Sequence, residues 1–329
     1  LKKKYPLQIS RGINDKSQNL FIEIKKDGIT AWGESAPGKT EGASSAKEVK
    51  DHLIRLINSD INTLSIYEVH QRCKDLNIPP CAQAAIDVAL WDLKAKEAKM
   101  SLKDLLGLPS PQVPSSITVG INPPEIIKER VEIILSNPQV KALKIKLGSP
   151  KGIEYDQLIY SQVIESAGKS NVAIRVDANG GWSLDEAQFM MKWLSQRKAE
   201  YIEQPLIEGD EDKLKFLFKG RPLPIFIDES CRVAEDVANF HHNVDGINLK
   251  LMKCGGITEA IKILNVAKSH SLKTMIGCMS ESSISISAGA SISGIIDYVD
   301  LDSHYNLDPD PSEGSKMENG ITITNSKYG

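Results

Sequence analysis

Five charged residues recur at nearly even intervals at the ends of apolar, strand-like segments. Three are acidic: Asp177 in VAIRVDAN, Glu203 in YIEQP and Asp228 in PIFIDES. Lys146 in ALKIKLG precedes them by one such segment, and Lys250 in GINLKL follows them by one. Consecutive members lie about 20 to 30 residues apart, a spacing that suits one strand and one helix per step. The pattern therefore predicts repeated strand-helix units whose strand ends carry charge.

The part of the chain after PSPQVPSS alternates strand-like and helix-like segments. We predict eight strands, at residues 116–121, 142–148, 172–179, 201–205, 224–230, 245–251, 273–278 and 298–302. Amphipathic stretches between most of them, such as SLDEAQFMMKWLSQRK, are long enough for crossover helices. Eight parallel strands within about 190 residues predict a closed (β/α) barrel, whose active site lies at the C-terminal ends of the strands.

The first part of the chain has a different texture. NLFIEIKK and GITAWGE alternate apolar and polar residues around the Asp27-Gly28 turn, as an antiparallel hairpin does. A loop rich in Gly, Ser and Pro follows at residues 33–45, and helical periodicity then covers residues 46–73 and 82–99. We therefore predict an α+β capping domain beside the barrel.

These textures predict two domains. We place the capping domain at residues 1–110, with a C-terminal return at about 304–329, and the barrel at residues 111–303. The 329 residues exceed what a single core usually organises, which agrees with such a division.

Composition excludes several classes of partner. Lys+Arg 40 against Asp+Glu 43 gives a net charge of −3, so no global basic field attracts nucleic acid or anionic lipid. No apolar run approaches the roughly 18 residues of a membrane span, and the start LKKKYPLQIS lacks a signal-peptide core. The five cysteines form no CxxC pair, which favours buried free thiols. We expect a cytoplasmic protein, and homo-oligomer formation is left open.

The acidic residues predict a metal site. Neighbouring parallel strands lie about 4.8 Å apart, so carboxylates that end three adjacent strands can converge on one small, hard cation. Three carboxylate ligands suit Mg²⁺ better than zinc, which prefers His or Cys. We therefore predict that Asp177, Glu203 and Asp228 bind Mg²⁺.

The lysines predict proton transfer. In a closed barrel of eight strands the second and sixth strands are opposed, so Lys146 and Lys250 face each other across the mouth. A substrate carboxylate bound to the cation would hold its α-carbon between two amines. One lysine then removes the α-proton and the other returns a proton to the opposite face, while the cation stabilises the enediolate. Lys144 points to the same side as Lys146 and, with the metal, would lower the pKa of the base.

Several segments together resemble one family. The KIK of the second strand, the ladder of Asp177, Glu203 and Asp228, and NLKLMKCGG around Lys250 are similar to the enolase superfamily, in its muconate-lactonizing-enzyme branch. AWGESAP and AIDVALWDLKAK are similar to the cap and linker helix of that branch, so the resemblance covers nearly the whole chain. The chain starts partway through the first cap strand that this branch leads us to expect, so the start we observe is expected to omit residues.

The resemblance implies a fold and a mechanism. The fold is an enolase-type barrel, a modified TIM barrel, with an α+β cap. Lys bases combined with Mg²⁺ are a general pattern of the superfamily. By resemblance, Lys146 and Lys250 form the acid/base pair, the three carboxylates bind Mg²⁺, and Lys144 is an auxiliary lysine near the substrate carboxylate.

The eighth strand narrows the substrate. In YVDLD, Asp300 and Asp302 are two residues apart and both should face inward, where uncompensated carboxylates are costly unless they meet a cation. They lie across the mouth from the metal, so an extended dipeptide could reach both ends and a free amino acid could not. This DxD also resembles the dipeptide epimerases of the superfamily, in which the pair holds the N-terminal ammonium. We therefore predict epimerisation of the C-terminal residue of a dipeptide, with L-Ala-D/L-Glu as leading candidate and Arg11 as partner of its acidic side chain.

Other functions stay open. The same enediolate chemistry serves an N-acylamino acid racemase, o-succinylbenzoate synthase or muconate cycloisomerase, although an ammonium-seeking aspartate pair argues against the last two. A non-catalytic barrel that binds a metal and a ligand is an alternative of another class. We assign Lys253, in the same NLKLMKCGG segment, to a solvated loop edge.

Overall fold

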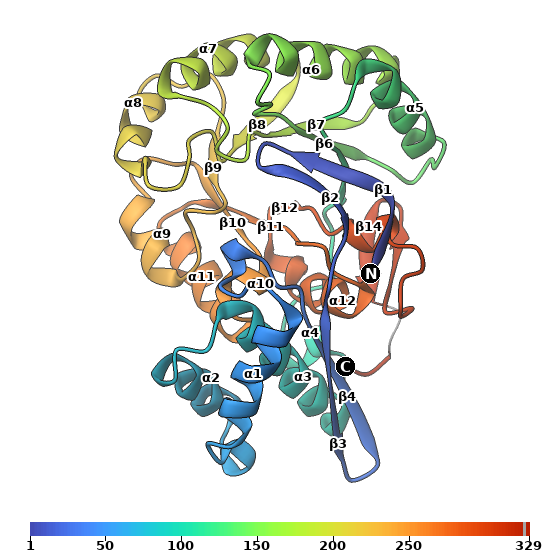
Figure 1. Ribbon diagram of the computed structural model, residues 1–329, viewed down its shortest axis with the longest axis vertical. Helices are drawn as coiled ribbons and strands as arrows, with labels where there is room; N and C mark the ends of the chain where they lie inside the picture. The colour runs from blue at the N-terminus through green and yellow to red at the C-terminus, as the bar shows by residue number, and fades with distance from the viewer. Residues whose placement is uncertain (325–326) are drawn as a thin grey trace.

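A parallel barrel forms the centre of the computed structural model, which describes residues 1–324 and 327–329. Eight parallel strands follow one another in chain order, as Figure 1 shows. The strands are β5 (Ser116–Val119), β6 (Ala142–Lys146), β7 (Ala173–Asp177), β8 (Ala199–Glu203), β9 (Ile225–Ile227), β10 (Gly246–Leu249), β11 (Lys273–Ile276) and β12 (Tyr298–Val299). Each overlaps its predicted range, so the predicted strand order is confirmed.

The sheet closes between β5 and β12. Ser115, just before β5, forms a parallel bridge with Val299 of β12. The Ser115 hydroxyl oxygen also accepts a 2.8 Å hydrogen bond from the backbone N–H of Leu301. Residues that alternate with the inward-facing charges, such as Ile145 and Val176, are fully buried in the main core. Alternation along each strand thus separates an apolar outer layer from a polar interior.

Helices surround the barrel (Figure 1). Those between its strands are α5 (Pro124–Leu135), α6 (Ile153–Ala167), α7 (Leu184–Ser195), α8 (Leu214–Phe218), α9 (Ala234–Phe240), α10 (Leu251–Cys254), α11 (Ile257–Ser269) and α12 (Ser283–Ile292). Local sequence explains where several begin. At α7, the Ser183 side chain accepts from the backbone of Glu186, and the Glu186 side chain accepts from the backbone of Ser183, which is a capping box.

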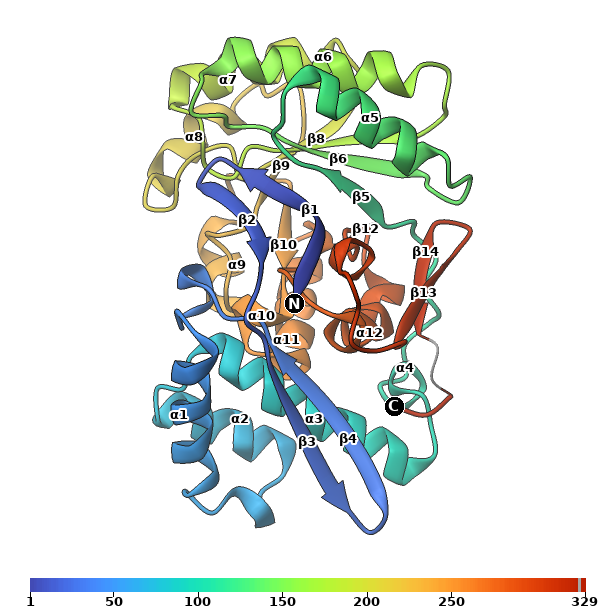
Figure 2. The ribbon, with the colours of Figure 1, turned by 45° about the vertical axis from the view of Figure 1, so that its right-hand side comes forward.

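The predicted α+β cap precedes the barrel and lies below it in Figure 2. The antiparallel hairpin turns at Asp27 and Gly28, which both have positive φ. A helix of the capping domain contacts the start of a barrel helix. There, the Asp87 carboxylate accepts hydrogen bonds from the backbone N–H and the hydroxyl of Thr258 in the first turn of α11. The cap elements are β3 (Leu20–Lys26), β4 (Ile29–Ser35), α1 (Ala46–Ile57), α2 (Ile66–Asp75), α3 (Pro80–Ala98) and α4 (Leu102–Leu105).

A second hairpin lies over the barrel mouth. β1 (Lys2–Ile9) and β2 (Gly12–Lys16) are antiparallel, and Figure 2 shows them in front of the ends of the barrel strands. The backbone N–H of Ile121 donates a 2.9 Å hydrogen bond to Gln8 O, and Lys3 forms a bridge with Leu307. The start of a barrel loop and the C-terminal segment therefore fix β1 in position at two points.

The remaining elements are short. They are β13 (Ser315–Glu318), β14 (Ile321–Thr324) and the 3-10 helices η1 (Lys39–Glu41), η2 (Ile61–Thr63), η3 (Glu211–Lys213), η4 (Ser293–Ile295) and η5 (Ser303–Asn306). All five cysteines are free thiols; four are buried and Cys278 is half-buried. Within residues 1–324 and 327–329, no helix has the length and apolar character needed to cross a bilayer.

Candidate active site

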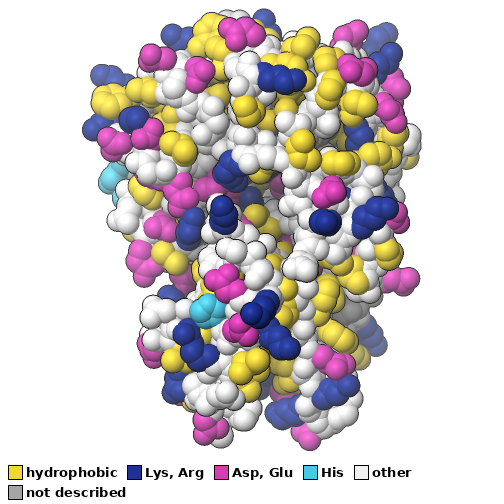
Figure 3. All heavy atoms as spheres, in the orientation of Figure 1, with side chains coloured by type: hydrophobic (Ala, Val, Ile, Leu, Met, Phe, Trp, Pro, Cys, Tyr) yellow, Lys and Arg dark blue, Asp and Glu magenta, His cyan; other side chains and the backbone are white. Residues whose placement is uncertain are grey.

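Five of the predicted site residues line one cavity at the C-terminal ends of the barrel strands. The cavity has a volume of about 470 Å³, and the β1–β2 hairpin forms part of its wall. Figure 3 shows this face of the molecule, hollowed near its centre where basic and acidic side chains meet. Lys146, Lys250, Asp300, Asp302 and Arg11 all line the cavity.

The three predicted metal ligands lie together. Asp177 ends β7, Glu203 ends β8 and pairs with Asp177 in the sheet register, and Asp228 directly follows β9. Each offers a carboxylate oxygen within 4.8 Å of the others, and all three residues are fully buried. The structure therefore forms the predicted cluster at the ends of three adjacent strands.

The cluster has oxygens left over for a cation. Glu203 Oε2 and Asp228 Oδ1 accept no hydrogen bond from the described residues, although Lys144 Nζ and Lys253 Nζ lie 2.8 and 2.5 Å away as ion-pair partners. Burial and the neighbouring Asp177 raise the pKa of Glu203 to about 8. Buried carboxyls that repel one another in this way are stabilised by a divalent cation. The donor set, hard oxygens only, fits Mg²⁺.

The two predicted acid/base lysines flank the cluster. Lys146 Nζ lies 2.6 Å from Asp177 Oδ2, and Lys250 Nζ lies 2.6 Å from Asp228 Oδ2. Lys146 ends β6 and Lys250 follows β10, so the three strands that carry the carboxylates lie between them in the barrel. The two ammonium groups therefore approach the cluster from its two sides.

Electrostatics couples each lysine to its carboxylate. Burial alone would raise the pKa of Asp177, but Lys146 and Lys144 outweigh it and hold that pKa below its usual value. For Lys250 the direction is reversed: burial alone would lower its pKa, but Asp228 outweighs burial and raises that pKa above its ordinary value. Without further positive charge, Lys250 is thus an acid rather than a base.

Lys144 connects the metal cluster to the eighth strand. It is fully buried, and its Nζ lies 3.3 Å from Asp177, 2.8 Å from Glu203 and 2.7 Å from Asp300. Burial lowers the pKa of Lys144, but these three carboxylates raise it well above its ordinary value. One buried ammonium thus links two residues of the carboxylate cluster to the eighth strand.

The two aspartates of the eighth strand have different surroundings. Asp300 meets Lys144 through Oδ2, and its Oδ1 accepts a 3.0 Å hydrogen bond from the Ser116 hydroxyl. Asp302 accepts a 2.6 Å hydrogen bond from the backbone N–H of Thr118 and has no ion-pair partner among the described residues. Burial and Asp300 raise the pKa of Asp302 to about 6. Of these two aspartates, Asp302 is thus the one without an ion-pair partner among the described residues.

Arg11 reaches the mouth from the turn of the β1–β2 hairpin. Its Nη2 lies 2.6 Å from Glu229 Oε1, and its Nη1 donates a 3.4 Å hydrogen bond to the backbone oxygen of Asn179. The guanidinium is therefore already paired with a buried carboxylate of the barrel.

Lys253 was misassigned from the sequence. It is 2% exposed and forms an ion pair with Asp228, so the prediction of a solvated loop edge is wrong. The physical reason is α10, which begins directly after Lys250 and turns Lys253 inward. Asn248, which donates a 2.8 Å hydrogen bond to Glu203 Oε1, was not predicted either. Its signal was available, since Asn248 lies two residues before Lys250 in one extended segment, so the two side chains face the same side.

Family comparisons cover most of the chain. Residues 127–328 match the family described as enolase C-terminal domain-like. Residues 1–107 match the N-terminal domain of mandelate racemase and muconate lactonizing enzyme.

Relatives at high identity are dipeptide epimerases. The chain is 55% identical over 323 residues to a hydrophobic dipeptide epimerase of Flavobacteria bacterium (strain MS024-2A), a match that covers 98% of this chain and 93% of the relative. A hydrophobic dipeptide epimerase of Roseobacter litoralis matches with the same identity and coverage.

A solved structure has the same fold. The dipeptide epimerase of Enterococcus faecalis V583, complexed with Mg and the dipeptide L-Leu-L-Tyr, superposes with a TM-score of 0.92 at 30% identity, over 100% of this chain and 95% of that one.

Proposed function

Because the chain belongs to the enolase superfamily, we propose that it is an Mg²⁺-dependent dipeptide epimerase that inverts the α-carbon of the C-terminal residue. Epimerase relatives at 55% identity support this activity, and so does the Mg-bound dipeptide epimerase of E. faecalis. The proposal therefore makes the protein an isomerase whose partner is a small-molecule dipeptide.

One observation carries the proposal: a buried carboxylate cluster lies between two lysines that line the same cavity. Asp177, Glu203 and Asp228 would hold Mg²⁺, which neutralises them and stabilises negative charge that develops on a substrate carboxylate. Lys146 and Lys250 would move protons on opposite faces of the α-carbon, because they approach the cluster from its two sides.

The rest of the cavity supports a dipeptide with a hydrophobic C-terminal residue. Asp302 is a half-buried carboxylate suited to the N-terminal ammonium of the substrate. Apolar side chains line much of the cavity, among them Leu7, Ile9, Ile117, Ile133, Val140 and Met317. L-Ala-D/L-Glu, the leading candidate from the sequence, stays a prediction, and its acidic side chain would have to displace Glu229 from Arg11.

Proton exchange tests the proposal directly. Purified protein with Mg²⁺ is incubated in D₂O with L-Ala-L-Leu, L-Leu-L-Tyr, L-Ala-L-Glu and N-succinyl-L-Leu, and proton NMR follows the α-proton of the C-terminal residue. We expect exchange and a second diastereomer for the hydrophobic dipeptides, and loss of both with EDTA. Turnover of N-succinyl-L-Leu with none of any dipeptide would instead indicate an N-acylamino acid racemase. Exchange that persists in EDTA would contradict metal dependence.

A further inference from the structure

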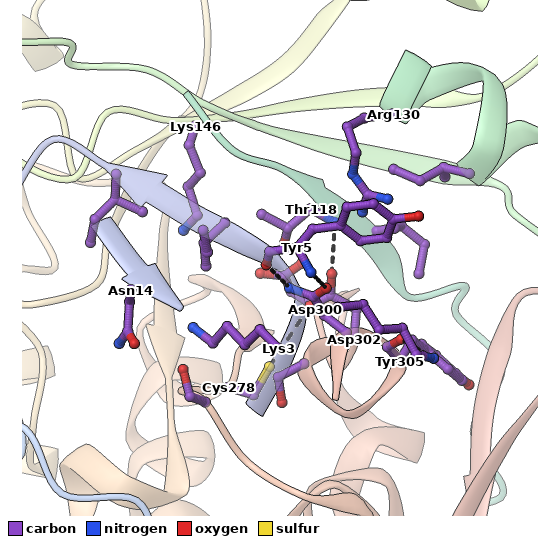
Figure 4. A pocket seen from close by; sticks show the side chains of 18 of the residues that line it. Lys3, Tyr5, Asn14, Thr118, Arg130, Lys146, Cys278, Asp300, Asp302 and Tyr305 are labelled. Carbon is purple, nitrogen blue, oxygen red and sulfur yellow. Dashed lines mark hydrogen bonds between the residues drawn. The ribbon is translucent and has the colours of Figure 1, made fainter. Parts of the chain in front are cut away.

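Three consecutive lysines on β1 have different surroundings. Lys2 and Lys4 are exposed, whereas Lys3 between them is 7% exposed. Strand alternation turns Lys3 toward the barrel, and Figure 4 shows its side chain extending into the cavity. The same view shows the ammonium of Lys3 directed away from Asp300 and Asp302. A charged group thus enters the active-site cavity from the cap rather than from the barrel.

The Lys3 ammonium has no hydrogen-bond partner among the described residues. Burial lowers the pKa of Lys3, and attraction to Cys278, Asp15 and Asp302 opposes this without outweighing it. A buried ammonium without an acceptor is costly in the free protein. Such a group persists where a ligand supplies the missing acceptor, as strained or unsatisfied groups do at functional sites.

The other cations of the cavity differ from Lys3 in this respect. Each has a partner in the protein: Lys146 contacts Asp177, Lys250 contacts Asp228, Arg11 contacts Glu229, Lys4 donates to Tyr305 O, and the Arg130 guanidinium lies over the Tyr5 ring. Among the described lining residues, Lys3 is therefore the cation whose donors are available to a ligand.

We infer that Lys3 donates a hydrogen bond to the peptide carbonyl oxygen of the dipeptide substrate, an assignment that rests on the proposed function. A dipeptide with its carboxylate at the Asp177 cluster and its ammonium at Asp302 presents one further backbone acceptor between these ends. That acceptor is the carbonyl oxygen of the peptide bond. No described residue accepts a hydrogen bond from Lys3 Nζ and so competes with this oxygen.

The contact would make Lys3 a determinant for substrates with an amide carbonyl next to the inverted residue, over acids that lack one. It positions the peptide bond beside the α-carbon that is inverted, without selecting the side chain. An alternative target for the ammonium is a carboxylate on the substrate side chain, which would make Lys3 selective for acidic dipeptides. These two targets predict different substrate dependence.

A double-change cycle, in which both the Lys3 side chain and the substrate carbonyl oxygen are replaced, tests the inference. Lys3→Met is compared with wild type on L-Ala-L-Leu, on L-Ala-L-Glu and on the thioamide analogue of L-Ala-L-Leu, whose sulfur is a weak acceptor. We expect Lys3→Met to lower kcat/KM about 10- to 100-fold on both ordinary dipeptides, mainly through KM. On the thioamide, wild type and variant should differ by less than about threefold. Lys2→Met, which changes the exposed neighbour, should match wild type throughout.

Two further readouts separate binding from folding. Removal of an unpaired buried charge should leave or raise the thermal midpoint of Lys3→Met, whereas loss of a structural lysine lowers it. Mn²⁺ binding, measured by titration, should be unchanged because Lys3 does not contact the carboxylate cluster. A loss confined to L-Ala-L-Glu would overturn the inference in favour of a side-chain carboxylate, and an equal loss on the thioamide would also overturn it. Absence of wild-type turnover on every dipeptide would reject the proposed function itself.

Discussion

Lys253 forms a buried ion pair with Asp228, with its Nζ 2.5 Å from Asp228 Oδ1. The same ammonium donates to the backbone oxygens of Asp228, Cys231 and Asn248, so backbone around β9 and β10 fixes its place. Asp228 Oδ2 is meanwhile 2.6 Å from Lys250. Lys253 is thus a counter-charge for a carboxylate that also belongs to the predicted cation site.

Removing this counter-charge should destabilise the metal-free protein. In Lys253→Met, Asp228 keeps only the Lys250 ammonium, and breaking a buried ion pair typically costs about 3 to 5 kcal/mol of unfolding free energy. A divalent cation replaces the lost charge, so Mg²⁺ should raise the thermal midpoint of the variant more than that of wild type. Scanning calorimetry with EDTA and with Mg²⁺ measures both values, and the exposed Lys268→Met serves as control. A smaller Mg²⁺ effect in Lys253→Met would contradict this charge argument.

The two aspartates of the eighth strand should respond differently to neutralisation. Asp302→Asn removes the carboxylate that awaits the substrate ammonium, so KM for L-Ala-L-Leu should rise about tenfold or more. N-acetyl-L-Ala-L-Leu lacks that ammonium and should be bound equally by both proteins in competition assays. Asp300→Asn instead removes a partner of Lys144 and should lower thermal stability. Equal effects of Asp302→Asn on both ligands would argue against an ammonium contact.

The sequence predicted the barrel and the clustering of three carboxylates because both depend on regular spacing. One strand and one helix per step carry Asp177, Glu203 and Asp228 to adjacent strand ends, whatever the details of packing. The strand period of two likewise sets the direction of Lys144 and Lys146. These features follow from the chain's own periodicity.

Other features depend on contacts between elements that are far apart in sequence. Strand alternation places both Asp300 and Asp302 inside the barrel, but which of them meets Lys144 depends on the stagger of the closed sheet. The hydrogen bond from Thr258, at the start of α11, to Asp87 likewise depends on how α3 docks against the barrel. Lys3 combines a predictable and an unpredictable feature. The strand period of two indicates that one of three consecutive lysines points inward, but its entry into the cavity depends on where β1 docks over the mouth.

Each acid/base lysine should serve one stereoisomer. Lys146→Ala and Lys250→Ala should each reduce epimerisation by a factor of about 10² to 10⁴. The lysine that remains can still exchange the α-proton on its own face, so each variant should exchange the proton of a different epimer in D₂O. Proton NMR of L-Ala-L-Leu and L-Ala-D-Leu separates the four rates. Unchanged turnover in both variants would indicate a non-catalytic barrel, and exchange of the same epimer by both would contradict lysines on opposite faces.

Acid should weaken the interface between cap and barrel at Glu259. This carboxylate of α11 is 1% exposed, and it accepts hydrogen bonds from His70 and Lys74 of α2. Burial raises its pKa, but His70, the backbone N–H of Ala234, Lys74 and the neighbouring Lys262 outweigh this and lower the pKa to about 2.

The sign of the pH effect follows from that lowered pKa. The folded protein binds a proton at Glu259 less readily than the unfolded chain, whose value is near 4.5. The stabilisation is therefore complete above about pH 4.5 and is lost as pH falls toward 2. The Glu259→Gln variant should have a lower unfolding free energy than wild type at pH 6. Between pH 6 and pH 3, its unfolding free energy should fall by less than that of wild type. Urea titrations at the two pH values measure this difference, and parallel losses in both proteins would exclude Glu259 as its source.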